Sequence, residues 1–216
     1  MRVIEIFKSI NGEGQRQGEL AIFIRLAGCN LRCSYCDTVY SFDKPIYKEF
    51  TINEILAEIK DYGIKNITLT GGEPLIHKGV KELIIALSKE GYRIEIETNG
   101  SVNIKEFLDI ENVSFTLDYK LPLSNMEEYM DFDNYKYISK KDTIKFVAGS
   151  INDLEKMLFI INKYNLIEKT CCIVSPVFKS IEPRDIVEFL LKHKLNDMKL
   201  ALQIHKFIWP ADKRGV

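Results

Sequence analysis

The chain has 216 residues, of which 46% are apolar and 28% charged, and its formal net charge is −1. This composition is typical of a globular protein and lacks the basic excess of a dedicated nucleic-acid binder, so we expect no nucleic-acid partner. Glu5 and Lys8 come too early for a secretory signal, and no apolar run approaches the ~20 residues that span a bilayer. We therefore predict a cytoplasmic protein that has no membrane partner and forms one domain over residues 1–216.

In chain order, short apolar runs alternate with longer segments of helical periodicity, which is typical of parallel βα units. The predicted strands are residues 21–26, 66–70, 93–97, 113–117, 143–147, 172–174 and 199–203. The predicted helices are residues 52–61, 79–90, 152–164 and 183–192. Thr51 and Glu54 form a capping-box pattern at the first helix, and Pro183 suits the first turn of the last one. Residues 121–141 are the least regular stretch and predict an excursion from the fold.

Unusual residues follow most of the predicted strands. In order, they are Cys29, Gly71-Gly72-Glu73-Pro74, Thr98-Asn99-Gly100, Asp118-Tyr119-Lys120 and Ser175-Pro176-Val177-Phe178. Because the carboxyl ends of parallel strands meet at one edge, where barrel folds build their active sites, this pattern predicts one shared site. Taken alone, the glycine-rich segment is also compatible with a simple tight turn.

Three cysteines, Cys29, Cys33 and Cys36, lie within eight residues, among polar neighbours that favour a loop over a core. Three thiolates leave one corner of a four-iron cluster without a protein ligand, and chemistry can take place at that open corner. The alternative is a structural zinc site, which needs a fourth ligand from a distant position. The candidates for that ligand are His77, His193, His205, Cys171 and Cys172. A disulfide framework is disfavoured, because the odd local count leaves one thiol over.

The CxxxCxxC spacing resembles the cluster-binding loop of the radical S-adenosylmethionine (SAM) superfamily. That resemblance implies an α/β fold of the radical SAM type, an incomplete β/α barrel of parallel strands. It also implies a 4Fe-4S cluster whose fourth iron binds SAM. The reduced cluster would split SAM into methionine and a 5'-deoxyadenosyl radical. Behind this loop, Gly71-Gly72-Glu73-Pro74 resembles the superfamily's glycine-rich turn, which holds the amino end of SAM.

Further segments resemble one family, the 7-carboxy-7-deazaguanine synthases. They are Ile10-Asn11-Gly12-Glu13-Gly14, the run from Ala21 to Cys29, Cys36-Asp37-Thr38, Thr70-Gly71-Gly72-Glu73-Pro74, Glu97-Thr98-Asn99-Gly100 and Gln203-Ile204-His205-Lys206-Phe207-Ile208-Trp209. The resemblance implies a lyase that converts 6-carboxy-5,6,7,8-tetrahydropterin to 7-carboxy-7-deazaguanine with loss of ammonia, on the route to queuosine and other 7-deazapurines. SAM would be a regenerated cofactor and Mg2+ a second metal. The expected partners are a pterin substrate, a reducing donor such as flavodoxin or ferredoxin, and a second copy of the chain in a homodimer.

The same resemblance assigns roles residue by residue. It places the cluster on Cys29, Cys33 and Cys36, and Mg2+ on Thr38. It assigns the substrate to Ile10, Asn11, Gly12, Glu13, Arg25, Thr70 and Val216. It assigns SAM to Gly72, Glu73, Asp118, Tyr119, Lys120, Ser175, Pro176, Val177 and Phe178. Many relatives have Ser-Pro-Lys where this chain has Asp118-Tyr119-Lys120.

Several of these residues also have an ordinary structural interpretation. Arg25 lies among apolar strand residues, where a guanidinium must be paired. Its partner is either the substrate carboxylate, held in a bidentate fork, or an internal acid such as Glu97. Thr38 could cap the following turn, and residues 11–14 could form a simple turn. The C-terminal Val216 could be frayed.

Two rival functions remain compatible with the sequence. One is a radical SAM activase that abstracts hydrogen from a glycine of a partner protein, which would need a wide opening for a polypeptide. The other is a zinc-binding module without catalysis. Arg25, the Cys-Asp-Thr segment and the C-terminal segment favour the pterin enzyme over both.

Overall fold

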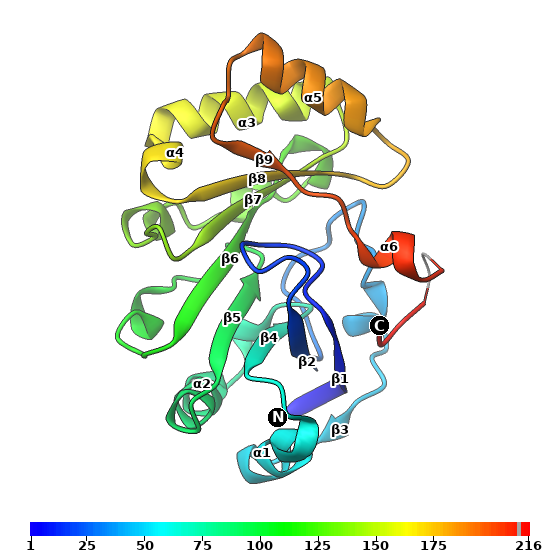
Figure 1. Cartoon of the computed structure of the whole chain (residues 1–216), viewed down its shortest axis with the longest axis vertical. Helices are drawn as coiled ribbons and strands as arrows, with labels where there is room; N and C mark the ends of the chain where they lie inside the picture. The colour runs from blue at the N-terminus through cyan, green and yellow to red at the C-terminus, as the bar shows by residue number, and fades with distance from the viewer. Residues whose placement is uncertain (211–212) are drawn as a thin grey trace.

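The chain forms a nine-stranded sheet with the order β3-β1-β2-β4-β5-β6-β7-β8-β9. The structure, a computed structural model, describes residues 1–210 and 213–216. Strands β2 and β4 to β9 run parallel to one another, whereas β1 is antiparallel to both β2 and β3. The sheet curves without closing (Figure 1). The predicted α/β fold, an incomplete barrel of parallel strands, is confirmed.

All seven predicted strands are present, with ends that differ by up to a few residues. The strands are β1 (Arg2–Ile10), β2 (Leu20–Leu26), β3 (Lys48–Glu49), β4 (Asn66–Gly71), β5 (Arg93–Thr98), β6 (Val113–Tyr119), β7 (Thr143–Ala148), β8 (Cys171–Pro176) and β9 (Met198–Leu200). The sequence analysis does not predict β1 or β3. Both belong to the antiparallel end of the sheet, outside the βα pattern used to find the other strands.

The predicted helices are also present. They are α1 (Ile52–Ile59), α2 (Val80–Lys89), α3 (Ile151–Tyr164) and α5 (Pro183–Lys192), and two single-turn helices, α4 (Leu166–Lys169) and α6 (His205–Ile208), accompany them. The predicted capping box begins α1, because the Thr51 hydroxyl accepts from the Glu54 N–H and the Glu54 carboxylate accepts from the Thr51 N–H. Pro183 is the first residue of α5, as predicted. Within the described residues, we find no helix with both the length and the apolar character needed to cross a bilayer.

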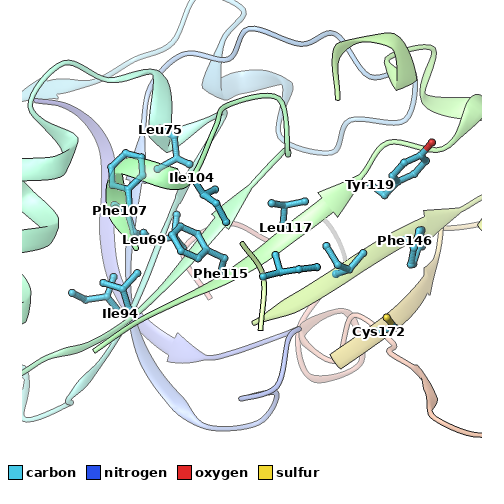
Figure 2. Close-up of a cluster of buried hydrophobic side chains, with 14 of the residues drawn as sticks. Leu69, Leu75, Ile94, Ile104, Phe107, Phe115, Leu117, Tyr119, Phe146 and Cys172 are labelled. Carbon is cyan, nitrogen blue, oxygen red and sulfur yellow. The ribbon is translucent and has the colours of Figure 1, made fainter. Parts of the chain in front are cut away.

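The two faces of the sheet differ in polarity because successive strand residues point to opposite sides. The outward side chains of β4, β5, β6 and β7 are apolar and pack against the helices, as Figure 2 shows for Leu69, Ile94, Phe115, Leu117 and Phe146. The alternate positions face the concave side and are polar. They include Thr68, Thr70, Glu95, Glu97, Thr116, Asp118 and Lys145. The sheet therefore encloses a buried polar interior.

Residues 121–141 form the predicted irregular excursion. The segment contains three short 3-10 helices, η5 (Pro122–Ser124), η6 (Glu127–Tyr129) and η7 (Phe132–Lys136). The Leu123 N–H donates to the Asp153 carboxylate at 3.0 Å, which ties the start of the segment to α3.

Candidate active site

The motif residues gather at the carboxyl edge of the parallel strands. The cysteine loop begins three residues after β2, Gly71 ends β4 and Thr98 ends β5. Two strands run two residues further than predicted, so that Asp118 and Tyr119 still belong to β6, and Ser175 and Pro176 still belong to β8. The prediction of one shared edge is confirmed, with strand ends corrected by one or two residues.

The glycine-rich turn after β4 is docked directly on the cysteine loop. The Gly72 N–H donates to the Leu26 carbonyl at 3.2 Å, and the Glu73 N–H donates to the Gly28 carbonyl at 2.9 Å. A Cβ atom on Gly72 would lie 2.3 Å from the Gly28 oxygen, which is far inside van der Waals contact. Glycine is therefore required here by the close approach of two backbones.

The three loop cysteines, Cys29, Cys33 and Cys36, are free thiols and half-buried. Within residues 1–210 and 213–216, no three His, Cys, Asp or Glu side chains are arranged to share one metal ion. A zinc site surrounds one ion with its ligands, whereas each thiolate of a cubane cluster binds a different iron. The arrangement therefore fits a cluster better than zinc.

An unpaired polar atom also lies in this loop. The hydroxyl of Tyr35, between Cys33 and Cys36, is buried and has no hydrogen-bond partner among the described residues. Buried polar groups are nearly always paired in folded proteins. The hydroxyl thus has the capacity to contact a ligand held at the loop.

Thr38 follows the cysteines at the start of η1 (Val39–Ser41) but does not cap it with its side chain. Its hydroxyl instead donates to the Asp37 carboxylate at 2.8 Å. The capping alternative is therefore wrong. The pair presents adjacent oxygen ligands of the type that Mg2+ prefers, and Asp37 is an acid to which the sequence analysis gives no role.

Arg25 on β2 is paired inside the protein. Its Nε donates to the Glu5 carboxylate at 2.7 Å, and the Tyr40 hydroxyl donates to the same oxygen at 3.2 Å. The expected internal partner was Glu97, and the structure corrects this to Glu5, which lies opposite Arg25 in the β1–β2 register. The bond uses Nε, and the guanidinium carries further N–H donors on its two terminal nitrogens.

Lys145 on β7 is the centre of a second buried network. Its ammonium lies 2.5 Å from a carboxylate oxygen of Glu13 and 3.0 Å from one of Asp118, and Asp118 also pairs with Lys120 at 2.6 Å. Burial alone would lower the pKa of Lys145, but the carboxylates of Asp118, Glu13 and Glu97 outweigh it and raise the pKa well above the ordinary value. The Lys145 ammonium thus links Glu13, an expected substrate residue, to Asp118, an expected SAM residue.

Sequence reasoning missed Lys145 and gave Glu97 no role of its own. Lys145 is a charged residue in an otherwise apolar strand, the same signal that singled out Arg25, whereas the strand of Glu97 alternates charged and apolar residues. Burial raises the pKa of Glu97, although Lys145 opposes the shift. The side chain of Thr70, an expected substrate residue, lies close enough to Glu97 to oppose this rise in pKa.

The loop between β1 and β2 enters the polar interior. The Asn11 amide donates to Glu95 at 3.0 Å and accepts from the Thr68 hydroxyl at 2.5 Å. Gly14 has a φ of 77°, and a Cβ there would lie 2.2 Å from the Glu95 carboxylate. The segment that includes Gly12 and Glu13 is thus more than a surface turn, because its neighbours are the inner side chains of β4 and β5.

Comparison with known proteins identifies the family. The profile of the "Radical SAM superfamily" matches residues 23–119. A 7-carboxy-7-deazaguanine synthase of Clostridium acetobutylicum is 53% identical, over 100% of this chain and 99% of the relative. The chain belongs to the 7-carboxy-7-deazaguanine synthase family. A Leptospira interrogans relative of the same name is 36% identical over 99% of this chain and 97% of its own length.

The fold has a solved counterpart. The crystal structure of QueE from Escherichia coli superposes with a TM-score of 0.75 and covers 93% of this chain and 92% of that chain at 23% identity. The radical SAM family uses a 4Fe-4S cluster and SAM, and the deazaguanine synthases depend on Mg2+, so the three expected cofactors are those of the family. The thiols, the glycine turn and the Thr38–Asp37 oxygens are residues of this chain that fit them.

Tyr119 points away from this site. Its ring is fully buried on the helix side of β6, 5.7 Å from the Phe146 ring and 6.5 Å from the Tyr135 ring, and its hydroxyl donates to Glu127 (Figure 2). Asp118 occupies the inward position, so the side chain of the next strand residue, Tyr119, must face outward. Only the Tyr119 backbone is left for the expected contact with SAM.

The Glu73 side chain is also committed inside the protein. Its carboxylate is fully buried and accepts from the Leu75 N–H, the Asn99 N–H and the Thr98 hydroxyl. Burial raises its pKa to about 7, against the lowering effect of these donors. Its side chain thus holds the two turns together, which leaves the expected contact with SAM to the Glu73 backbone.

The residues after β8 and the end of the chain have mixed surroundings. The Ser175 hydroxyl donates to the Ala201 carbonyl at 2.9 Å, and Val177 packs against Gly149, so both side chains are engaged internally. Phe178 is exposed, with the Lys206 ammonium 4.8 Å from its ring centre. Near the C-terminal Val216, the Arg214 guanidinium lies 3.8 Å from the centre of the Tyr40 ring. The described end of the chain therefore returns to the neighbourhood of Arg25.

The carboxyl of Glu95 predicts a pH-dependent stability. Burial raises its pKa from 4.5 to about 7. Between these values the folded chain keeps a proton that the unfolded chain has released, so stability falls as the pH rises through this window. We expect Glu95→Gln to remove the loss and to exceed the wild type in stability at pH 8, by about 1.4 kcal/mol per pKa unit of the shift.

Urea unfolding at pH 5 and pH 8 measures this effect. The glutamine amide can still accept from Asn11 and donate to the Thr116 hydroxyl, so the hydrogen bonds of the site are retained. Glu90→Gln, at the exposed end of α2, is the matched control and should show the same change in the free energy of unfolding between pH 5 and pH 8 as the wild type. If Glu95→Gln shows the same pH dependence of the free energy of unfolding as the wild type, Glu95 is not its source.

Proposed function

We propose that this chain is a radical SAM lyase that converts 6-carboxy-5,6,7,8-tetrahydropterin to 7-carboxy-7-deazaguanine with loss of ammonia. SAM is regenerated in each cycle, and the product enters queuosine or another 7-deazapurine pathway. The observation that carries the proposal is the 53% identity to a relative of that name over the full length of both chains. The buried polar interior beside the cysteine loop supports it.

In this proposal, Cys29, Cys33 and Cys36 hold the cluster. When bound, the cluster and SAM supply a hydrogen-abstracting radical, and Mg2+ supplies a Lewis acid. Gly72 contributes backbone groups to SAM, because its turn lies against the cysteine loop. Further SAM contacts come from Asp118 and Lys120, and from the segment Ser175, Pro176, Val177 and Phe178 through exposed backbone or the Phe178 ring.

The substrate occupies the interior next to Arg25. The guanidinium binds the 6-carboxylate with its terminal nitrogens while Glu5 holds Nε, so the arginine is oriented before the substrate arrives. Thr70 lies beside Arg25 in the β2–β4 register and completes this wall. The backbone of Ile10, Asn11 and Gly12 holds the pterin edge, and the Val216 carboxylate contacts the substrate in the same region. The position of Arg214 over the Tyr40 ring supports this last assignment.

Glu13 accepts hydrogen bonds from the N–H groups of the pterin in this proposal. The Lys145 ammonium fixes the position of its carboxylate, because the two groups are 2.5 Å apart. A carboxylate held in this way offers two oxygens that can accept N–H donors from a guanine-like edge. Lys145 is therefore a positioning residue for the substrate.

The remaining expectations are part of the same proposal. Residues 1–216 form one radical SAM core domain that acts in the cytoplasm without a nucleic-acid or membrane partner. A flavodoxin or ferredoxin supplies the electron, and two copies of the chain form a homodimer.

The experiment that tests the function is a reconstituted assay. Protein purified and reconstituted without oxygen is incubated with carboxytetrahydropterin, SAM, Mg2+ and a reductant. We expect the deazaguanine chromophore, one ammonia per product, and SAM that is not consumed. If the protein cleaves SAM but forms no deazaguanine, the proposed substrate is wrong and the alternative function, a glycyl-radical activase, is favoured. If metal analysis finds one zinc per chain and no sulfide, the alternative of a non-catalytic zinc-binding module is favoured.

A second prediction concerns Mg2+. Thr38→Ala should raise the Mg2+ concentration for half-maximal activity roughly tenfold or more, because the metal loses an oxygen ligand and Asp37 loses its hydrogen bond. The cluster content should not change. Thr51→Ala, which removes the α1 cap far from the loop, is the control and should keep the wild-type Mg2+ dependence. An unaltered Mg2+ response in Thr38→Ala would rule out this role.

A further inference from the structure

The Asn99 side chain reaches the cysteine loop from the turn after β5. Its amide nitrogen lies 3.7 Å from the Cys29 sulfur and 3.0 Å from the Asn30 side-chain oxygen. Its amide oxygen accepts from the N–H of Ser101 at 2.9 Å and from the Ser101 hydroxyl at 2.6 Å. Two donors therefore fix the oxygen end, and the NH2 group must face the cysteine loop.

The backbone of Asn99 is held just as firmly. Its N–H donates to the buried Glu73 carboxylate at 2.6 Å, and the neighbouring Thr98 hydroxyl donates to both oxygens of that carboxylate. Gly100, the next residue, has a φ of 79°, and a Cβ there would lie 2.5 Å from the Asp118 carbonyl oxygen. The turn is thus locked between the glycine-rich turn and β6, and Asn99 has little freedom to move away from Cys29.

We propose that Asn99 is a tuning residue, whose amide donates a hydrogen bond to the Cys29 thiolate and raises the reduction potential of the cluster. The inference rests on the proposed cluster site. A hydrogen bond to a ligating sulfur withdraws electron density from the iron, which favours the reduced state. The bond is formed in a partly buried environment, where a donor to an anionic acceptor has a greater effect than at the exposed surface.

Glu73 acts through Asn99 in this scheme. Its carboxylate does not contact the sulfur, but it fixes the backbone from which the amide projects. The glycine-rich turn therefore has two tasks, to offer backbone groups on one side and to position a sulfur-directed amide on the other. Cys29 also accepts from the Leu31 N–H at 3.4 Å, so the side-chain bond adds to a backbone bond within the loop.

The test is a reductive titration of the reconstituted full-length protein, followed by electron paramagnetic resonance. Asn99→Ala should titrate at a more negative midpoint potential than the wild type, with the same iron and sulfide content. Asn99→Asp should shift it further, because it replaces the donor with a negative charge while keeping an acceptor for Ser101. Ser101→Ala is the matched control, since it disturbs the same turn without removing the donor, and should keep the wild-type midpoint.

An unchanged midpoint in Asn99→Ala with a complete cluster would overturn the proposal. If the variants fail to assemble a cluster, a measurement on the wild-type protein tests the proposal instead. Wild-type protein labelled with 15N in asparagine side chains should show a 15N coupling to the reduced cluster in pulsed resonance spectra, and its absence would also overturn the proposal. These readouts do not depend on turnover, so a tuned cluster in a protein inactive on the pterin would reject the proposed substrate and leave this inference intact.

Discussion

Cys33→Ala is expected to abolish both the cluster and the reaction. Three thiolates are the minimum that holds a four-iron cluster and leaves one iron free, and the loss of one leaves two irons without protein ligands. Cys33 is in the middle of the loop and is half-buried. The visible absorbance, the iron content and the sulfide content of the reconstituted variant should all fall together.

Cys171→Ala is the matched control for this change. Cys171 is also a free, half-buried thiol, but it lies on β8 and outside the cysteine loop. We expect this variant to keep a full cluster and wild-type turnover. A Cys33→Ala protein with normal iron, sulfide and deazaguanine formation would show that the loop does not hold the cluster.

Arg25→Met should weaken substrate use strongly. The bidentate bond between a guanidinium and a carboxylate stabilises the complex by about 3 kcal/mol, which corresponds to roughly a 100-fold loss in kcat/KM. The loss should fall mainly on KM, because the 6-carboxylate is a binding handle in the ground state as well as in the transition state. Steady-state kinetics with varied pterin at saturating SAM measures the effect.

Two controls separate this role from a purely structural ion pair. Glu5→Gln removes the negative charge of the partner of Arg25 but keeps an acceptor oxygen and the guanidinium, so it should change KM much less than Arg25→Met does. A tetrahydropterin without the 6-carboxylate should inhibit the wild type and Arg25→Met equally, because neither protein can use the missing group. If Arg25→Met and Glu5→Gln lower the stability equally and raise KM equally, the role of Arg25 is structural and not substrate binding.

Local spacing was enough to predict most of the secondary structure and the cysteine loop. The capping box at Thr51 and the proline at position 183 involve only residues within one helical turn, and both predictions are confirmed. The errors concern strand ends and the two strands of the antiparallel end, β1 and β3, which were not predicted. Because β6 runs two residues beyond the predicted end, Asp118 and Tyr119 lie on opposite faces, and only one of them can face the site.

Charge in an apolar strand predicted burial but not the partner. Arg25 was recognised as a guanidinium that must be paired, yet the choice among the acids depends on which strands are neighbours. Glu5 could not be identified as the partner because the strand that carries it, β1, was not predicted. Lys145 carries the same signal as Arg25, and only the pairing of β7 with β6 and the entry of the β1–β2 loop show what it binds.

By itself, the sequence determined the chemistry that this protein can support. Three thiols at a loop spacing, a double glycine and a buried arginine are properties of short segments, and they indicate a cluster, a close backbone approach and an anionic ligand. Only the tertiary structure decided that Asn99 meets Cys29, that Glu73 holds the turn between them, and that Lys145 joins Glu13 to Asp118. These contacts join residues up to 132 positions apart, and their existence depends on strand order and register, which no local pattern of residues contains.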